Sequence, residues 1–137
     1  MYKKILVPID LAQTEKADAM VKAAHDYRTQ GGEIIMATVV PDFPPYVVSG
    51  LPAGYIEDQL PGAKAELREI ATSAGVSSAN TFVRAGHPAN LILSIAESEG
   101  CDLIIIGSHR PGLKDYFLGS TASRVVGHAT CSVLVMR

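Results

Sequence analysis

IIIGSHRPGLKDYFLGST, residues 104–121, joins an apolar run to a polar loop and then to the start of an amphipathic segment. A short run without polar residues is typical of a strand that is buried on both faces of a parallel sheet. Gly119 and Ser120 suit the start of a helix that we expect to run from about Ser120 to Gly127. The stretch therefore predicts a strand, a loop and a helix in succession, which is the repeating pattern of α/β proteins.

The same alternation extends over the whole chain. We expect strands at residues 4–8, 33–40, 81–85, 103–106 and 132–136, and helices at residues 14–29, 56–74, 88–99 and 120–127. Gly31-Gly32 is expected to end the first helix, and Pro41 to end the second strand. Because strands joined by helices form right-handed parallel crossovers, the predicted fold class is α/β, a doubly wound, mostly parallel five-stranded sheet with helices on both faces, Rossmann-like in type. We expect one such domain over residues 1–137.

Composition excludes several classes of function. The net charge of -2 gives no general attraction for nucleic acid or for an anionic membrane. The first apolar run, Ile5-Leu6-Val7, is too short for a signal peptide or a membrane span, so we expect a cytoplasmic protein that does not insert into membranes. Cys101 and Cys131 have no metal-ligand spacing, and we interpret them as buried thiols without chemistry in a reducing compartment.

The predicted ligand site lies at the carboxyl edge of the sheet. In doubly wound sheets, ligands bind beyond the carboxyl ends of the strands, at the point where the strand order reverses. The loops after Val7, Val39 and Ile106 are therefore the candidate positions. Gly107 would let a ligand approach the backbone where its strand ends.

The start of the last helix has the features of a phosphate site. Gly119, Ser120 and Thr121 can offer free N–H groups and hydroxyls at the positive end of a helix dipole. Arg110 and Lys114 lie in the preceding loop, and a guanidinium adds the forked donor that phosphates favour. An anion could thus be bound by local geometry despite the negative net charge.

Each feature also has a purely structural interpretation. Gly119 and Ser120 form a good helix start, Gly107 can be an ordinary turn residue, and the two basic side chains can form a solvated face. Asp10, just beyond the first strand, can accept from a ribose hydroxyl or an adenine amine, or hold a magnesium ion against phosphates. Alternatively, Asp10 begins the first helix through an Asx turn.

At this point the sequence resembles the universal stress protein family over essentially its whole length. KKILVPID at residues 3–10 resembles the opening of the family pattern, and DLIIIGSH at residues 102–109 resembles its fourth strand. LGS at residues 118–120 and CSVLV at residues 131–135 resemble its close. The resemblance implies a Rossmann-like fold of the universal stress protein type.

The chain departs from the nucleotide-binding pattern of that family at two points. Gly107 matches the first glycine and Gly119-Ser120 match the last pair, but Arg110 stands where the middle glycine is expected, and the loop is one residue shorter. The sequence Ser-His-Arg-Pro at residues 108–111 is similar to a bacterial subgroup that also binds ATP.

The resemblance implies an ATP site, with magnesium bridging the phosphates and no separate protein metal site. It assigns residues to adenosine, ribose and phosphates together, namely Pro8, Ile9, Asp10, the backbone at Val39, Ile106, Gly107, His109, Arg110, Gly119, Ser120 and Thr121. His109 has no acid partner or nucleophile beside it in the sequence, so we expect it to position a phosphate or cap the loop, and we assign no catalytic residue.

The resulting hypothesis is a regulatory ATP-binding module in the stress response, whose occupied state another, unidentified protein recognises. Two alternatives remain open: a dimeric interaction protein of the same fold that binds no nucleotide, and a slow ATPase. A homodimer or higher assembly is expected through the C-terminal strand, because residues 133–136 would otherwise leave an apolar edge bare. The proline-rich segment 41–55 is expected to be a mobile loop that a nucleotide or a second subunit orders in part.

Overall fold

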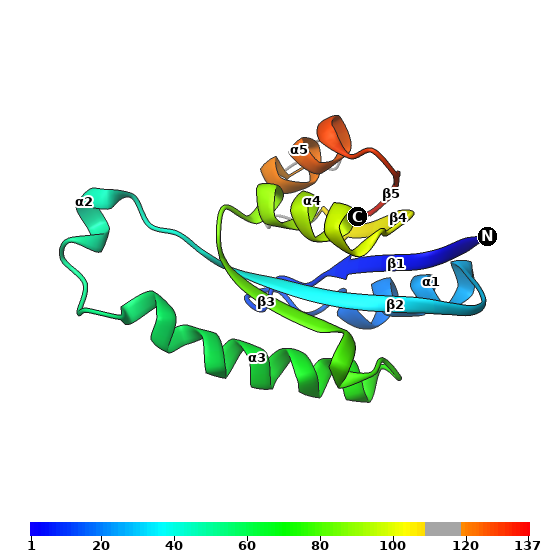
Figure 1. Cartoon of the computed structure of the whole chain (residues 1–137), viewed down its shortest axis with the longest axis horizontal. Helices are drawn as coiled ribbons and strands as arrows, with labels where there is room; N and C mark the ends of the chain where they lie inside the picture. The colour runs from blue at the N-terminus through cyan, green and yellow to red at the C-terminus, as the bar shows by residue number, and fades with distance from the viewer. Residues whose placement is uncertain (109–118) are drawn as a thin grey trace.

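A computed structural model describes residues 1–108 and 119–137 of the chain. Figure 1 shows a central sheet with α1 and α3 on one face and α4 and α5 on the other. The elements, in chain order, are β1 (Tyr2–Pro8), α1 (Ala17–Tyr27), β2 (Arg28–Pro41), α2 (Pro45–Val48), α3 (Tyr55–Ser73), a 3₁₀ turn (Ser78–Asn80), β3 (Thr81–Gly86), α4 (Pro88–Glu99), β4 (Leu103–Gly107), α5 (Ser120–His128) and β5 (Ser132–Met136). The predicted fold class is confirmed.

The strand order is β3-β2-β1-β4-β5, and every pair of neighbours is parallel. The chain thus winds outward in one direction from β1 and then returns to place β4 on the other side of β1. Strand order reverses between β1 and β4, which makes the carboxyl ends of these two strands the expected position of a ligand.

The core consists of two layers, one on each face of the sheet. Alternate residues of β1 divide between them: Ile5 and Val7 pack with α1 and α3, whereas Leu6 packs with α4 and α5. All three side chains are fully buried. A strand buried on both faces needs a continuous apolar sequence, which explains why the run Ile5-Leu6-Val7 shows no alternation with polar residues.

Three predicted boundaries in the first half of the chain are wrong. The first helix was expected at residues 14–29, but α1 covers only Ala17–Tyr27, and β2 begins at Arg28 rather than at residue 33. Gly31-Gly32, expected to end the helix, lies inside β2, where Gly31 has a φ of 81°. Arg28 pairs with Tyr2 and Glu33 pairs with Lys4, so the extra residues that include the glycines form an irregularity in β2. Pairing with β1 on both sides of it prevails over the local turn signal.

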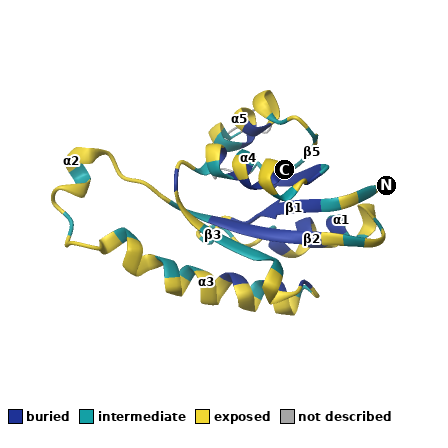
Figure 2. Cartoon of the chain, viewed as in Figure 1, coloured by how far each residue is buried: buried dark blue, intermediate teal, exposed yellow. Residues whose placement is uncertain are grey.

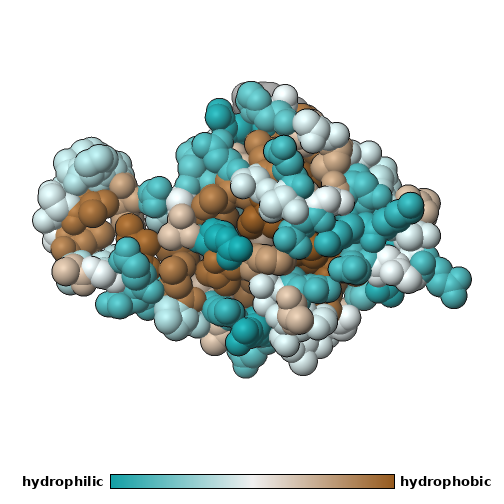
Figure 3. Space-filling model, viewed as in Figure 1, coloured by the Kyte–Doolittle hydropathy of each residue, from teal (hydrophilic) through white to brown (hydrophobic). Residues whose placement is uncertain are grey.

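The segment between β2 and α3 projects from the sheet as an arm, defined as residues 42–54 (Figure 1). The sequence predicts a loop, but the structure contains one helical turn, α2, with Pro45 at its first position, where a proline needs no N–H partner. Figure 2 shows the arm mostly exposed, and Tyr46 has 80% of its surface accessible. Figure 3 shows hydrophobic side chains gathered on the arm and on the adjoining face of the body.

Candidate functional site

The carboxyl ends of β1 and β4 separate where the strand order reverses. Their recorded pairing covers only Ile5–Leu6 against Leu103–Ile104, whereas β1 continues to pair with β2 as far as Pro8 and β4 continues to pair with β5 as far as Gly107. Pro8 contributes to this separation because it has no N–H to donate to a neighbouring strand. The carboxyl ends of β1 and β4 are therefore no longer paired with each other, at the position where doubly wound folds bind ligands.

Pro8 and Ile9 form a buried floor beside this separation. The N–H of Ile9 donates to the carbonyl oxygen of Ala37 at 2.7 Å, and the hydroxyl of Thr38 donates to the carbonyl oxygen of Ile9 at 2.7 Å. Thr38 is only 3% exposed, so these bonds are shielded from water. They fix the direction in which the chain leaves β1 and thus the position of the next residue, Asp10.

Asp10 is exposed at the carboxyl edge and forms an Asx turn. Its Oδ1 accepts from the N–H of Ala12 at 2.9 Å, and its carbonyl oxygen accepts from the N–H of Gln13 at 2.9 Å. The structural alternative for Asp10 is therefore present, although α1 begins only at Ala17. One oxygen orders the turn, and a carboxylate has a second oxygen that can accept from a ligand hydroxyl or amine.

Ser108 joins the two ends of the loop that precedes α5. Its N–H donates to the carbonyl oxygen of Met136 at 2.8 Å, and its hydroxyl oxygen accepts from the N–H of Gly119 at 3.0 Å. The prediction that Gly119 offers a free N–H is therefore wrong, because that group is already bonded within the protein. Sequence reasoning also missed Ser108, which anchors the start of α5 beside the end of β4.

The N–H groups at the start of α5 come after Gly119. No side chain among residues 1–108 and 119–137 caps the helix, and the first backbone bond that follows runs from Ser123 to the carbonyl oxygen of Gly119 at 2.9 Å. Ser120 is exposed and Thr121 is partly exposed. Because the first turn of a helix leaves its N–H groups without backbone partners, Ser120, Thr121 and the next residue present donors at the positive end of the dipole.

Lys16 is a residue near this edge that the sequence did not single out. Its Nζ is buried and has no hydrogen-bond partner within residues 1–108 and 119–137. A Cβ placed on Gly107 would lie 3.8 Å from the Cδ of Lys16 and 3.3 Å from the sulfur of Met20. The lysine stem therefore passes beside the residue that ends β4.

The remaining predicted site residues divide into two groups. Val39 lies near the carboxyl end of β2 and pairs with Arg84 of β3, which places it one strand away from the separation beside β1. Ile106 is buried and pairs with Val135. His109 and Arg110, together with Lys114, lie outside the residues that the structure describes.

The amino edge of the sheet has a different set of polar contacts. Asp102 accepts from the N–H groups of Lys3 and Lys4 at 2.9 and 3.0 Å, and thus ties the start of β1 to the start of β4. Desolvation tends to raise the pKa of Asp102, but the backbone hydrogen bonds, first those from Lys3 and Lys4, together with the positive charge of Lys3 outweigh it, so the pKa lies below its ordinary value. Lys4 also lies 3.7 Å from Glu99.

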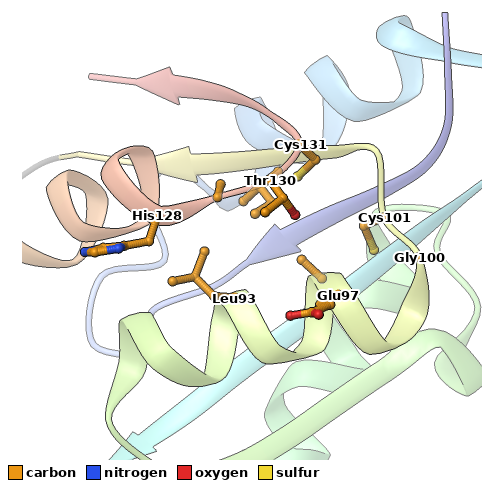
Figure 4. A pocket seen from close by; sticks show the side chains of 10 residues that line it. Leu93, Glu97, Gly100, Cys101, His128, Thr130 and Cys131 are labelled. Carbon is orange, nitrogen blue, oxygen red and sulfur yellow. The ribbon is translucent and has the colours of Figure 1, made fainter.

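A cavity of about 280 Å³ opens at this same amino edge, between α4, α5 and the starts of β4 and β5 (Figure 4). Both cysteines line it and both are free thiols. Burial raises the pKa of Cys101 to about 11 and also raises the pKa of Cys131. Thiols with raised pKa values are mostly protonated at neutral pH and therefore react slowly as nucleophiles. Cys101 is buried, as the sequence predicts, whereas Cys131 is only partly buried.

No group of three or more His, Cys, Asp or Glu side chains in the described part of the chain could hold a metal ion. His25 contacts the carbonyl oxygen of Ala74 at 2.9 Å and so joins α1 to the end of α3, while His87 caps α4 by accepting from the N–H of Asn90. Within residues 1–108 and 119–137, no helix has the length and apolar character that crossing a membrane requires.

Comparison with known proteins agrees with the fold and identifies a family. The profile of the universal stress protein family matches residues 1–137. Universal stress protein A homolog 2 of Coxiella burnetii is 36% identical over 140 residues, which cover 99% of this chain and 95% of that protein.

Two solved structures extend this comparison. The hypothetical protein MJ0577 superposes with a TM-score of 0.81 and 30% identity, covering 99% of this chain and 96% of the other. A universal stress protein in complex with cAMP superposes with a TM-score of 0.60 and 21% identity, covering 99% and 97% of the two chains, which shows a common fold.

Proposed function

The chain belongs to the universal stress protein family, and we propose that it is an ATP-binding regulatory module acting in the stress response in the cytoplasm. The observation that carries this proposal is the uncapped start of α5, held beside the separated ends of β1 and β4 by the bond from Gly119 to Ser108. An uncapped helix start at the reversal of strand order is where doubly wound folds bind phosphates. A protein of this fold has been solved with cAMP, which makes an adenine nucleotide the first ligand to test.

In this proposal, the two strands and the helix bind different parts of ATP. Pro8 and Ile9 provide an apolar floor for adenosine, and Asp10 accepts from a ribose hydroxyl or an adenine amine with the oxygen that the Asx turn leaves available. The N–H groups and hydroxyls of Ser120 and Thr121 donate to the phosphates. Magnesium, if bound with the nucleotide, would supply positive charge beside the phosphate oxygens.

The remaining proposed contacts complete the site. The backbone at Val39, the end of β4 at Ile106 and Gly107, and the side chains of His109 and Arg110 flank the ribose and phosphates. Arg110 stands in place of the middle glycine of the family pattern. A glycine would let the phosphates come close to the backbone, whereas the guanidinium of Arg110 offers them a forked side-chain donor. We propose that this substitution and the sequence of residues 108–111 place the chain in an ATP-binding subgroup.

The direct test is identification of the nucleotide that the protein carries, followed by calorimetric titration with Mg-ATP. We expect an adenine nucleotide to co-purify. Ser120→Glu should lower ATP affinity at least about tenfold, because a carboxylate would lie among the phosphates although it suits a helix N-terminus. Val126→Glu is the matched control, since it adds the same charge to an exposed position of the same helix, away from its start.

If neither ATP, ADP nor AMP binds and no nucleotide co-purifies, the alternative of an interaction protein without a nucleotide becomes the better account. Sustained magnesium-dependent release of phosphate would instead favour a slow ATPase. Either result would contradict the proposed function.

We also propose that the module, a single domain over residues 1–137, assembles as a homodimer or a higher oligomer through β5. This strand lies at the edge of the sheet with only β4 beside it, and its residues from Val133 to Met136 are partly exposed. An apolar edge strand with unpaired backbone groups is a surface that soluble proteins cover. Light scattering at micromolar concentration should give at least a dimer, and a monomer with and without ATP would contradict this assembly.

A further inference from the structure

The strongest unexplained feature of the described chain is the buried ammonium of Lys16. Its Nζ is shielded from solvent and has no hydrogen-bond partner within the described residues. Lysine is rarely buried without a partner, because removing an ammonium from water is costly unless an anion or several acceptors replace the water. An unsatisfied buried charge in a native protein therefore requires an explanation.

The position of Lys16 on its helix makes the charge more unusual. Lys16 is the N-cap of α1, its backbone oxygen accepts from the N–H of Met20 at 2.9 Å, and no side chain caps the helix. The N-terminal end of a helix is positive, so it favours anions and disfavours a lysine. Neither hydrogen bonding nor the helix dipole explains why a cation lies there.

The surroundings of Lys16 lead to the candidate site. Its Cδ lies 3.8 Å from where a Cβ would stand on Gly107, and the next residue, Ser108, binds the N–H of Gly119 at the start of α5. Lys16 belongs to the helix layer formed by α1 and α3, whereas α5 belongs to the opposite layer (Figure 1). The side-chain stem of Lys16 and the first turn of α5, which no side chain caps within the described residues, thus lie toward the end of β4 from the two faces of the sheet.

We infer that Lys16 is the counter-ion of the phosphate chain of the bound nucleotide, and that it makes the site select nucleotides over uncharged nucleosides. The ammonium pairs with a phosphate oxygen on the α1 side, while the first turn of α5 donates to the phosphates from the other side. The identity of the ligand as a nucleotide rests on the proposed function. The presence of an anion beside Lys16 does not rest on that function.

The test compares the wild-type protein with Lys16→Met and with Lys22→Met. Methionine keeps the length and most of the apolar stem of the side chain but removes the charge. Lys22 is the matched control because it lies on the same helix and is exposed, with a single contact to Asp26 at 3.4 Å. Binding of Mg-ATP, adenosine and inorganic tripolyphosphate is measured by calorimetry, and melting temperatures are measured without ligand.

We expect Lys16→Met to lower the affinity for ATP at least about tenfold, to leave the affinity for adenosine unchanged, and to abolish stabilisation by tripolyphosphate. Without ligand, this variant should melt at the same temperature as Lys22→Met or above it, because a buried unpaired charge has been removed. Lys16→Arg should retain the preference for ATP over adenosine, since it keeps the charge.

Three results would overturn the inference. The first is an unchanged ATP affinity in Lys16→Met, and the second is loss of the preference for ATP in Lys16→Arg. The third is a melting temperature of Lys16→Met well below that of Lys22→Met, or failure to fold, which would mean that Lys16 pairs with a carboxylate of the chain itself.

Failure of the proposed function gives a different pattern. If wild type binds neither ATP nor adenosine but tripolyphosphate stabilises it and not Lys16→Met, the anion site stands and the ligand is another polyphosphate. If tripolyphosphate has no effect on wild type either, both the ligand and the role of Lys16 are contradicted.

Discussion

The two edges of the sheet differ in how their polar groups are satisfied. At the amino edge, Asp102 accepts from two backbone N–H groups, and Lys4 lies beside Glu99. At the carboxyl edge, Lys16 has no partner within residues 1–108 and 119–137, and α5 begins without a side-chain cap. Polar groups paired within the protein stabilise the fold, whereas groups left without partners lower stability and are available to a ligand.

This difference makes a general prediction about substitutions. Changes at the amino edge should alter stability and leave ligand binding unchanged, and changes at the carboxyl edge should do the reverse. The cavity lies at the amino edge, so a search for concave sites alone would point there. The polar groups of Asp102 and Lys4 at that edge, however, are already paired within the protein.

The largest effect on stability is expected from the thiol of Cys101 at high pH. Burial raises its pKa from 9.0 to about 11, so the folded state holds the proton more tightly than the unfolded state. This stabilisation is complete below pH 9.0 and is lost as the pH rises through about 11. After allowance for screening by solvent, we expect a loss of about 1–2 kcal/mol.

Urea unfolding across this pH range can measure the loss. Cys101→Ala should be less stable than wild type at neutral pH because it leaves a small cavity, and the difference should shrink or reverse as the pH rises. Parallel pH profiles for the two proteins would show that the thiol does not titrate with the raised pKa.

A similar or smaller effect is expected from Asp102→Ala, which removes the acceptor that joins β1 to β4. We expect a loss of about 1–2 kcal/mol in the free energy of unfolding, because hydrogen bonds to a carboxylate are strong but these are partly exposed to water. Asp26→Ala is the control, since Asp26 is exposed and contacts only Lys22 on its own helix. Equal losses for the two variants would contradict the role of Asp102.

The same carboxylate predicts the sign of the acid response. The pKa of Asp102 is lowered by hydrogen bonds from Lys3 and Lys4, so its stabilisation is present above the ordinary value of 3.8 and is lost as the pH falls through the lowered value. Asp102→Asn should therefore lose less stability on acidification than wild type, which unfolding followed by circular dichroism can measure.

The smallest effect on stability is expected on the arm. Tyr46 is 80% exposed, so Tyr46→Ser should change the free energy of unfolding by no more than about 0.5 kcal/mol. Although the arm leaves the sheet at the carboxyl edge, it packs little against the body (Figure 2). A loss above about 1 kcal/mol at low protein concentration would show that Tyr46 stabilises the isolated chain.

The fold could be predicted from the sequence because burial determines it at each strand. Runs such as Ile104-Ile105-Ile106 have no polar residue to face water, and the structure buries all three. The start of β2 could not be predicted, since Gly31-Gly32 is a turn signal and only pairing with β1 extends the strand through it. The helical turn α2 (Pro45–Val48) could not be predicted either, because four residues are too few to show a helical period, and the local sequence favours a loop as much as a helix.

The candidate site could be predicted in part. Its location followed from the topology, because the loops after β1 and β4 had to meet at the carboxyl edge. Ser108 was missed because a single serine after a glycine has no distinctive pattern, and its bond to Gly119 joins residues eleven positions apart. Lys16 was missed because only the folded structure shows that its ammonium is buried.

The most direct test of the proposed function measures the rise in melting temperature that Mg-ATP causes in wild type, Ser120→Glu and Asp102→Ala. At about 100 times the dissociation constant, a ligand stabilises the folded state by roughly 2.7 kcal/mol, which corresponds to a rise on the order of 5 to 15 °C for a domain of this size. We predict this rise in wild type and in Asp102→Ala, whose substitution lies at the opposite edge, and at most about half of this rise in Ser120→Glu, as an affinity loss of at least about tenfold requires. No rise in wild type, or an equal rise in Ser120→Glu, would contradict ATP binding at the start of α5.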